Sequence, residues 1–419
     1  MHIPIGLLIS LAPLASAWVT PPTNTNHNNH NKLTRPVLLQ ASVEKTETVA
    51  TSNDGGLLQP EFEAAFGMIC AQVKDKLPEK YMDVMFPLLE HFAKEYVTAC
   101  QTSFLANANN QEVAQLSRPD VVAKRFLLGI QLAMTYGMDG PNKFQFEPYH
   151  QMCLGEDPDK EMGNTLDLYQ VGNDFFRPCI DMNKSALHGR DNIEKIMDQM
   201  KQGHNVVMLA NHQSEADPQV VSCLMSEMTD YGKEFQNMIF VAGHKVTTDP
   251  LAVPFSMGRN LICIHSKKHI DADPDTKAAK QKDNLRAMSA MLKSFKQGGA
   301  LLWVAPSGGR DRRNVETGQV PIAPFDSKTI DMFRLIGNKS KVPTHYYTMA
   351  MVTYDMCPPP DSVEAGTGEA RNIRFVPCGI AVGDECESVG GLETRHAFCD
   401  HAFAQCEKDY QALLKAIEG

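Results

Sequence analysis

The sequence lacks several features that mark common functional classes. Its 40 Lys and Arg are outnumbered by 50 Asp and Glu, and the formal net charge of −10 argues against a nucleic-acid-binding protein, which needs a basic surface. Beyond the N-terminus, no apolar run approaches the roughly 20 residues that cross a bilayer as a helix. The 11 Cys form neither Cys-x-x-Cys pairs nor zinc spacing, so we expect reduced, mostly buried thiols and no disulfide framework.

Acidic side chains are absent from residues 1–43, a segment predicted to direct transport and not to fold. Residues 1–17 contain an apolar stretch and end in Ala-Ser-Ala, as signal peptides do, and residues 18–45 have the Thr- and Asn-rich composition of a transit peptide. The combination resembles the bipartite presequences of algae with secondary plastids and predicts localisation in the plastid (chloroplast) stroma. Plain secretion is the alternative, and the thiols disfavour it.

The predicted mature protein is more acidic than the whole chain. Residues 1–43 carry two positive side chains, Lys32 and Arg35, and no negative one, so their removal changes the net charge from −10 to −12. Residues 46–58 are polar and predict a linker. Residues 59–141 predict a helical bundle domain, because apolar side chains recur there every three or four positions. One such series is Phe62, Phe66, Ile69, Val73 and Leu77.

Residues 142–419 predict an α/β domain in which short apolar strands alternate with helices. The strands are expected at residues 206–210, 238–242, 260–265, 300–305 and 344–353. An amphipathic helix is expected at residues 193–202 and a long helix at 277–297, and the aromatic stretch 173–178 is expected to be irregular. The predicted fold class is therefore α/β, with a mostly parallel mixed sheet flanked by helices and preceded by a small all-helical N-terminal domain.

The strongest candidate for catalysis is the sequence Asn-His-Gln-Ser-Glu-Ala-Asp-Pro at 211–218, just after a predicted strand. Asp217 is expected to be the N-cap of the next helix, with Pro218 at its first position. His212 and Asp217 would then share the sheet edge where open α/β sheets bind ligands. A neutral imidazole can accept a proton from a hydroxyl, and a carboxylate on its other nitrogen fixes the tautomer. A loop His beside a helix-capping Asp, without chemistry, is the alternative.

Two basic stretches also follow predicted strands. They are Ser-Lys-Lys-His at 266–269 and Pro-Ser-Gly-Gly-Arg-Asp-Arg-Arg at 306–313. Glycines allow a backbone to approach an anion, and the arginine fork matches phosphate geometry. Four side chains could together hold one phosphate dianion: Lys268, His269, Arg310 and Arg312. The alternative is that they are solvated surface charges.

The chain shares further motifs with one known family. Besides 211–218, 266–269 and 303–312, they are Phe-Val-Ala-Gly at 240–243, Thr-Asp-Pro at 248–250, Pro-Phe-Ser-Met-Gly-Arg-Asn-Leu-Ile-Cys at 254–263, Pro-Phe-Asp at 324–326 and Pro-Pro-Pro at 358–360. This set resembles the His-x-x-x-x-Asp glycerolipid acyltransferases, and within them the soluble plastid (chloroplast) glycerol-3-phosphate acyltransferases. Two positions depart from expectation. His244 stands where an acidic residue is expected, and Ser307 replaces the Glu of membrane-bound relatives.

The resemblance implies a specific reaction. A fatty acyl group passes from acyl-acyl carrier protein, or from acyl-CoA, to the sn-1 hydroxyl of glycerol 3-phosphate, giving lysophosphatidate in the first step of plastid glycerolipid synthesis. His212 and Asp217 carry over as the catalytic pair, and Lys268, His269, Arg310 and Arg312 as the phosphate site. No metal or other cofactor is expected, because the thioester co-substrate is already activated. We expect backbone amides of the His212 loop to stabilise the tetrahedral oxyanion.

The implied partners are acyl carrier protein and glycerol 3-phosphate, together with peripheral membrane contact and no nucleic acid. Because carrier proteins and this chain are both acidic, docking requires a local basic patch. The candidates on one predicted helix are Lys277, Lys280, Lys282 and Arg286, and a merely solvated helix face is the alternative.

Other functions remain open at this stage. A lysophosphatidate acyltransferase uses the same His-Asp block, although its membrane relatives usually carry transmembrane helices. A non-catalytic acyl-lipid-binding protein could be built on the same fold. A phosphatase would need a metal cluster or a Cys-x-x-x-x-x-Arg loop, and the sequence has neither.

Overall fold

The computed structural model describes residues 57–153, 166–265, 270–271, 274–359 and 370–418. The predicted signal peptide (1–17), the predicted transit peptide (18–45) and most of the predicted linker (46–58) lie outside these ranges, as do Lys268 and His269. All described residues belong to one compact unit, Leu57–Gly419. The predicted boundary between a helical domain at 59–141 and an α/β domain at 142–419 stays a prediction.

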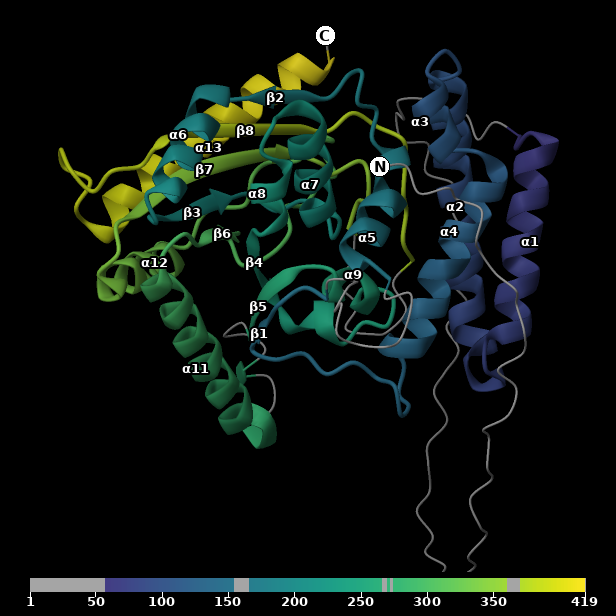
Figure 1. Cartoon of the computed structure of the whole chain (residues 1–419), viewed down its shortest axis with the longest axis horizontal. Helices are drawn as coiled ribbons and strands as arrows, with labels where there is room; N and C mark the ends of the chain where they lie inside the picture. Colours follow the sequence, from purple (N-terminus) through teal and green to yellow (C-terminus); the bar gives the residue numbers. More distant parts are fainter. Residues whose placement is uncertain (1–56, 154–165, 266–269, 272–273, 360–369, 419) are drawn as a thin grey trace, which may run out of the picture. The chain divides into compact units, whose positions relative to one another are not determined.

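The chain from residue 60 to residue 137 is mainly helical. Its elements are α1 (Pro60–Lys76), a 3-10 turn (Glu79–Tyr81), α2 (Met82–Ala106), α3 (Gln111–Leu116), α4 (Pro119–Leu132) and a π-helical turn (Ala133–Gly137). Two prolines begin α1 and α4, where the missing N–H costs nothing. Figure 1 shows α1, α2 and α4 side by side. Their apolar stripes are buried, and the Tyr96 ring of α2 stacks on Phe175 at 4.3 Å between centroids.

An eight-stranded mixed sheet forms the centre of the remaining chain (Figure 1). The strands are β1 (Tyr149–His150), β2 (Ala186–His188), β3 (Asn205–Ala210), β4 (Ile239–Gly243), β5 (Asn260–Ile264), β6 (Leu301–Val304), β7 (Thr344–Val352) and β8 (Gly379–Glu385). Their order is β1-β5-β4-β6-β3-β7-β8-β2. The central run β5-β4-β6-β3-β7 is parallel, and so is the pair β8-β2, while β1 pairs antiparallel with β5 and β8 antiparallel with β7. The predicted α/β fold with a mostly parallel mixed sheet is confirmed.

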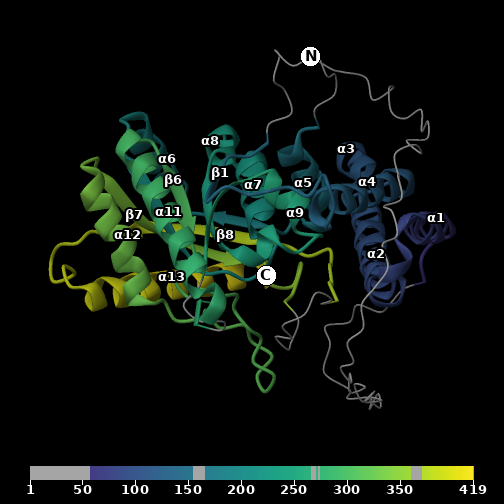
Figure 2. The same ribbon diagram turned by 90° about the horizontal axis from the view of Figure 1, so that it is seen from below.

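Helices cover both faces of this sheet. They are α5 (Leu168–Phe176), α6 (Arg190–Lys201), α7 (Asp217–Met228), α8 (Gly232–Gln236), α9 (Val253–Met257), α11 (Pro274–Gln297), α12 (Ser327–Ser340) and α13 (Arg395–Glu418), with 3-10 turns at Arg177–Cys179 and His244–Thr247. Figure 2 shows α11 and α12 next to each other, as in Figure 1. The prediction that residues 173–178 are irregular is wrong. They continue α5 and its 3-10 turn, because Phe175 and Phe176 turn inward against Phe255.

Alternating side chains of each strand supply two separate cores. Val206 and Met208 of β3 pack on one face with residues of α6, α7 and α8, whereas Val207 and Leu209 pack on the other with residues of α11, α12 and α13. All six positions of β3 are buried, as expected for the middle strand of a sheet covered on both faces. The core therefore holds β3, and the loop that follows it, in a fixed position.

The cysteines behave as the sequence predicts. All 11 are free thiols, and nine of them are buried.

No helix within the described ranges is both long and apolar enough to span a bilayer.

Candidate active site

The parallel strands bring several loops to one edge of the sheet. The carboxyl ends of β3, β4, β5, β6 and β7 lie at this edge, and the segments that follow them carry the motifs predicted to bind substrate. The loop after β3 leads into α7, which begins at Asp217 with Ala216 as its N-cap. The prediction that Asp217 caps α7 is therefore wrong by one residue. Its carboxylate does not cap the helix but turns back onto the loop.

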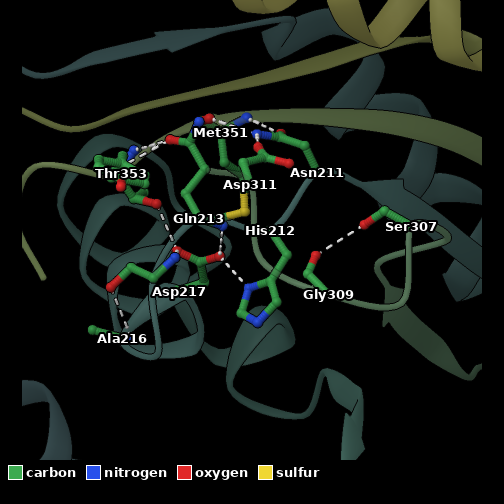
Figure 3. A network of polar contacts seen from close by, with 12 residues as sticks. Asn211, His212, Gln213, Ala216, Asp217, Ser307, Gly309, Asp311, Met351 and Thr353 are labelled. Carbon is green, nitrogen blue, oxygen red and sulfur yellow. Dashed lines mark hydrogen bonds and ion pairs between the residues drawn. The ribbon is translucent and has the colours of Figure 1, made fainter. Parts of the chain in front are cut away.

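His212 and Asp217 form a direct pair. The Nδ1 atom of His212 lies 2.8 Å from Oδ2 of Asp217, as Figure 3 shows. Because an ionised carboxylate only accepts hydrogen bonds, this contact places the imidazole proton on Nδ1 and leaves Nε2 as a proton acceptor. In Figure 3 the other ring nitrogen points away from Asp217. The side chain of His212 is 26% exposed, so the acceptor nitrogen belongs to a partly accessible residue.

The carboxylate of Asp217 is held by three further donors. The backbone N–H of Gln213 bonds to Oδ2 at 2.9 Å, that of Ser214 to Oδ1 at 3.1 Å, and the Thr353 hydroxyl to Oδ1 at 2.6 Å. The side chain of Asp217 is 0% exposed. A buried carboxylate with four donors has no freedom to turn, so it fixes the imidazole in one orientation.

These contacts limit which amides of the His212 loop are free to bind the oxyanion. The backbone amides of Gln213 and Ser214 already donate to Asp217, and the amide of Ala216 donates to the Ser214 hydroxyl. Three amides of the His212 loop are therefore occupied and do not face a substrate. The sequence alone does not show this. Burying the Asp217 carboxylate without hydrogen bonds would cost free energy, so these amides point toward it.

The amide side chains of Asn211 and Gln213 fix the His212 loop to neighbouring elements. Asn211 accepts from the backbone N–H of Met351 at 2.7 Å and donates to Asp311 Oδ2 at 3.0 Å. Gln213 accepts from the backbone N–H of Thr353 at 2.8 Å and bonds to the Tyr410 hydroxyl at 3.1 Å. The loop is thereby tied to β7, to α13 and to the segment after β6. The sequence motif contains both amides, but it does not show their partners, which lie 100 to 197 residues away along the chain.

Asp311 is a second buried carboxylate beside the pair. Its backbone N–H donates to the His212 carbonyl at 2.6 Å, and its Oδ1 accepts from the backbone N–H of Ala323 at 2.8 Å. Burial raises the pKa of Asp311 to about 6, and the charge of Asp217 adds to this effect, against hydrogen bonds that lower it. A strongly perturbed carboxyl next to a His-Asp pair is typical of a functional site.

The predicted phosphate-binding residues fall into two groups. Lys268 and His269 lie outside the described residues. Arg310 and Arg312 are half-buried and flank Asp311, whose backbone is bonded to His212. Arg310 makes no hydrogen bond or ion pair with any residue of the described ranges, and its charge helps to lower the pKa of Glu215. The structure thus brings these two arginines to the His212 loop.

Two histidines stack at the ends of β4 and β5. The rings of His244 and His265 are 3.6 Å apart and 8° from parallel. Burial lowers the pKa of His244 to about 4, the neighbouring His265 adds to this, and Asp283 partly opposes it. The ring atom Nε2 of His244 is buried without a hydrogen-bond partner. His244, which stands where an acidic residue is expected, is therefore a neutral ring that stacks on His265.

Arg371 is a residue of this region that sequence reasoning missed. It lies within hydrogen-bond distance of both Glu215, in the His212 loop, and Asp249, after β4. A single arginine in a segment without a motif gives no signal in the sequence. Its significance comes only from the two carboxylates that the fold places around it.

The predicted docking helix is α11. Lys277 pairs with Asp271 at 2.9 Å, and Arg286 lies 3.6 Å from Glu147. Leu285 is 71% exposed on the same helix.

Among the described residues, no group of three or more His, Cys, Asp or Glu side chains is arranged to hold a metal ion.

Comparison with known proteins identifies close resemblances. Residues 184–351 match the family model described as Acyltransferase. The chain is 35% identical over 339 residues to "Glycerol-3-phosphate acyltransferase, chloroplastic" of Arabidopsis thaliana, which covers 79% of this chain and 68% of the relative. It is 37% identical over 289 residues to "Glycerol-3-phosphate acyltransferase ATS12, chloroplastic" of Cucurbita moschata, covering 67% and 60%. It is 34% identical over 320 residues to "Glycerol-3-phosphate acyltransferase, chloroplastic" of Phaseolus vulgaris, covering 74% of this chain and 67% of the relative. The chain thus spans 60–68% of the length of these curated relatives.

Proposed function

This chain belongs to the chloroplastic glycerol-3-phosphate acyltransferase family, and we propose that it transfers a fatty acyl group from a thioester to the sn-1 hydroxyl of glycerol 3-phosphate. The products are lysophosphatidate and a free thiol. The observation that carries this proposal is the 2.8 Å contact between His212 Nδ1 and Asp217 Oδ2. It leaves Nε2 of the imidazole as a base at the sheet edge where Arg310 and Arg312 lie.

The proposed reaction is a direct transfer with His212 as base. Nε2 accepts the proton of the sn-1 hydroxyl while the hydroxyl oxygen attacks the thioester carbonyl carbon. The tetrahedral intermediate collapses as the carbon–sulfur bond breaks, and the departing thiolate takes the proton back from His212. Asp217 stabilises the imidazolium that exists between the two proton transfers. Proton count and charge balance over the cycle, and no cofactor is required, because the thioester supplies the activation.

The phosphate of the acceptor would be bound by arginine and lysine side chains. Arg310 and Arg312 flank the residue whose N–H bonds to the His212 carbonyl, so a phosphate held there is close to the base. We include Lys268 and His269 in this site on the family resemblance. Fixing the acceptor in this way makes the attack effectively intramolecular, which lowers the barrier by as much as about 7–11 kcal/mol in well-oriented systems.

The donor and the cellular location complete the proposal. We propose acyl-acyl carrier protein as the donor, with acyl-CoA as a substitute, and α11 as its docking surface through Lys277, Lys280, Lys282 and Arg286, beside the exposed Leu285. The curated relatives are chloroplastic, which supports a plastid location for this chain. The bipartite signal and transit peptide, and peripheral contact with the membrane that receives the product, are part of the same proposal.

The test is an acceptor comparison with the mature protein starting at Thr46. Purified protein is given labelled acyl-acyl carrier protein with glycerol 3-phosphate or with lysophosphatidate, and the products are separated by chromatography. The proposal predicts lysophosphatidate from glycerol 3-phosphate and no phosphatidate from the second acceptor. Turnover of lysophosphatidate alone would assign the chain to the later acylation step. Lipid binding without turnover of either acceptor would indicate a non-catalytic protein.

A further inference from the structure

Arg371 joins two carboxylates from two different loops of the site. Its Nε lies 2.7 Å from Oε1 of Glu215, and its Nη2 lies 2.6 Å from Oδ2 of Asp249. A second contact, from Nη2 to Oε2 of Glu215, measures 3.4 Å. The Arg371 side chain is 15% exposed. The planar guanidinium suits this double contact, which a lysine could not reproduce.

Glu215 is the carboxylate of this cluster nearest to the chemistry. It lies in the loop between His212 and Asp217, and its side chain is 31% exposed. Burial raises the pKa of Glu215, but the charge and hydrogen bonds of Arg371 outweigh burial, and Arg310 and Lys245 contribute in the same direction. The net effect is a pKa below the usual value. Glu215 is therefore an anion within electrostatic range of Arg310.

Glu215 and Asp249 carry charge of the same sign as the acceptor in the proposed reaction. The acceptor in the proposed reaction carries a phosphate dianion, and Arg310 is a candidate for binding it. Without a neutralising cation, Glu215 and Asp249 would repel the dianion and attract Arg310 to themselves. The interaction is strong because the groups are partly removed from water, where charges are less screened.

We propose that Arg371 is a positioning residue for the acceptor phosphate, which neutralises Glu215 and Asp249 and leaves Arg310 available to the dianion. The inference rests on the proposed function, because it takes glycerol 3-phosphate as the acceptor. It assigns to Arg371 no contact with the substrate. Loss of Arg371 therefore weakens acceptor binding and leaves the chemical step largely intact.

The first experiment measures steady-state kinetics of the full chain and of Arg371→Ala. The Michaelis constant for glycerol 3-phosphate should rise at least tenfold, while kcat changes less than threefold. Arg118→Ala is the matched control, because Arg118 pairs with Asp120 at an exposed site and its loss should leave both constants unchanged. An unchanged Michaelis constant in Arg371→Ala would overturn the proposal.

The second experiment separates charge from packing. The variant with Arg371→Met, Glu215→Gln and Asp249→Asn removes the cation together with both anions, and its Michaelis constant should lie within threefold of wild type. Restoring Glu215 alone in that variant should raise the constant at least fivefold. The comparison holds even if Arg371→Ala does not fold. A neutral variant as impaired as the one with Glu215 restored would show that packing, and not charge, is the role of Arg371.

Binding of inorganic phosphate by calorimetry tests the inference independently of turnover. Wild type should bind phosphate at least five times more tightly than Arg371→Ala. If wild type has no transferase activity but this difference is present, the proposed function fails and the role of Arg371 in anion binding stands. If activity is present and phosphate affinities are equal, the proposed function stands and this inference fails.

Discussion

Thr353 donates a hydrogen bond of 2.6 Å from its hydroxyl to Oδ1 of Asp217, the oxygen opposite the one that contacts His212. Thr353 follows β7, so the orientation of the catalytic carboxylate depends on the strand that pairs with β3. The contact lies in a buried site, where a lost donor leaves an unsatisfied oxygen.

Replacing Thr353 with Val should therefore impair both stability and catalysis. The substitution keeps the shape of the side chain but removes the hydroxyl, and we expect a loss of about 1–3 kcal/mol in the free energy of unfolding. We expect kcat to fall about tenfold, because the imidazole is held less firmly. Urea unfolding and steady-state kinetics measure the two effects. Thr353→Ser keeps the hydroxyl and should retain most activity; equal kcat in the Val variant and wild type would refute this role.

Arg310→Ala should raise the Michaelis constant for glycerol 3-phosphate. Removing a charged hydrogen-bond partner of phosphate costs about 1.5–3 kcal/mol, which corresponds to an increase of roughly 10-fold to 150-fold. The value of kcat at saturating acceptor should change much less. Arg313→Ala is the matched control on the same segment, because Arg313 is tied to Asp355 and is not expected to bind phosphate. Equal effects of both substitutions would argue against a specific phosphate contact.

His244 should make stability depend on pH. Its pKa in the folded protein is lowered from 6.5 to about 4 by burial and by His265, so the unfolded chain binds the proton more tightly. The stability that neutral His244 contributes is complete above pH 6.5 and is lost as the pH falls toward 4. His244→Phe keeps a stacking ring without titrating, so its Tm should fall less than that of wild type between pH 7 and pH 5. The exposed His401→Phe is the control, and identical pH profiles for wild type and His244→Phe would contradict the assignment.

The contribution of Asp311 to stability should change with pH in the direction opposite to that of His244. Its pKa in the folded protein is raised from 3.8 to about 6, so the folded chain binds more protons in this interval. The contribution of Asp311 to stability therefore falls as the pH rises from about 4 to about 6, and it is constant above that range. The stability of wild type relative to Asp311→Asn should decrease by up to about 3 kcal/mol between pH 4 and pH 6.5. Urea unfolding across this range measures the difference, and a pH-independent difference would refute the prediction.

The sequence predicted the elements whose signal is local. The apolar run 206–210 gave β3 within one residue, since the structure places it at Asn205–Ala210. β1 and β2 have two and three residues, too few to show any period. The sequence of 173–178 predicts an irregular aromatic stretch, whereas the structure is helical there. The packing of Phe175 and Phe176 against Phe255 decides its structure.

The candidate site likewise has a local part, which the sequence shows, and distant contacts, which it does not show. The His212–Asp217 pair is visible in the sequence because both residues belong to one loop. The long-range contacts of this loop are not, because Thr353, Asp311 and Arg371 come from segments about 100 residues or more away. Such contacts depend on the order of strands in the sheet. The register of β3 with β6 and β7 is what brings these segments together.

The central claim is that His212, held by Asp217, is the base that activates the acceptor hydroxyl. The most direct test is the turnover number of His212→Ala, measured with saturating glycerol 3-phosphate and labelled acyl-acyl carrier protein, on protein whose fold is verified by circular dichroism. The account predicts a loss of about 10²–10⁴-fold in kcat, with the Michaelis constant for glycerol 3-phosphate within threefold of wild type. A variant that folds and keeps more than a tenth of wild-type turnover would contradict it.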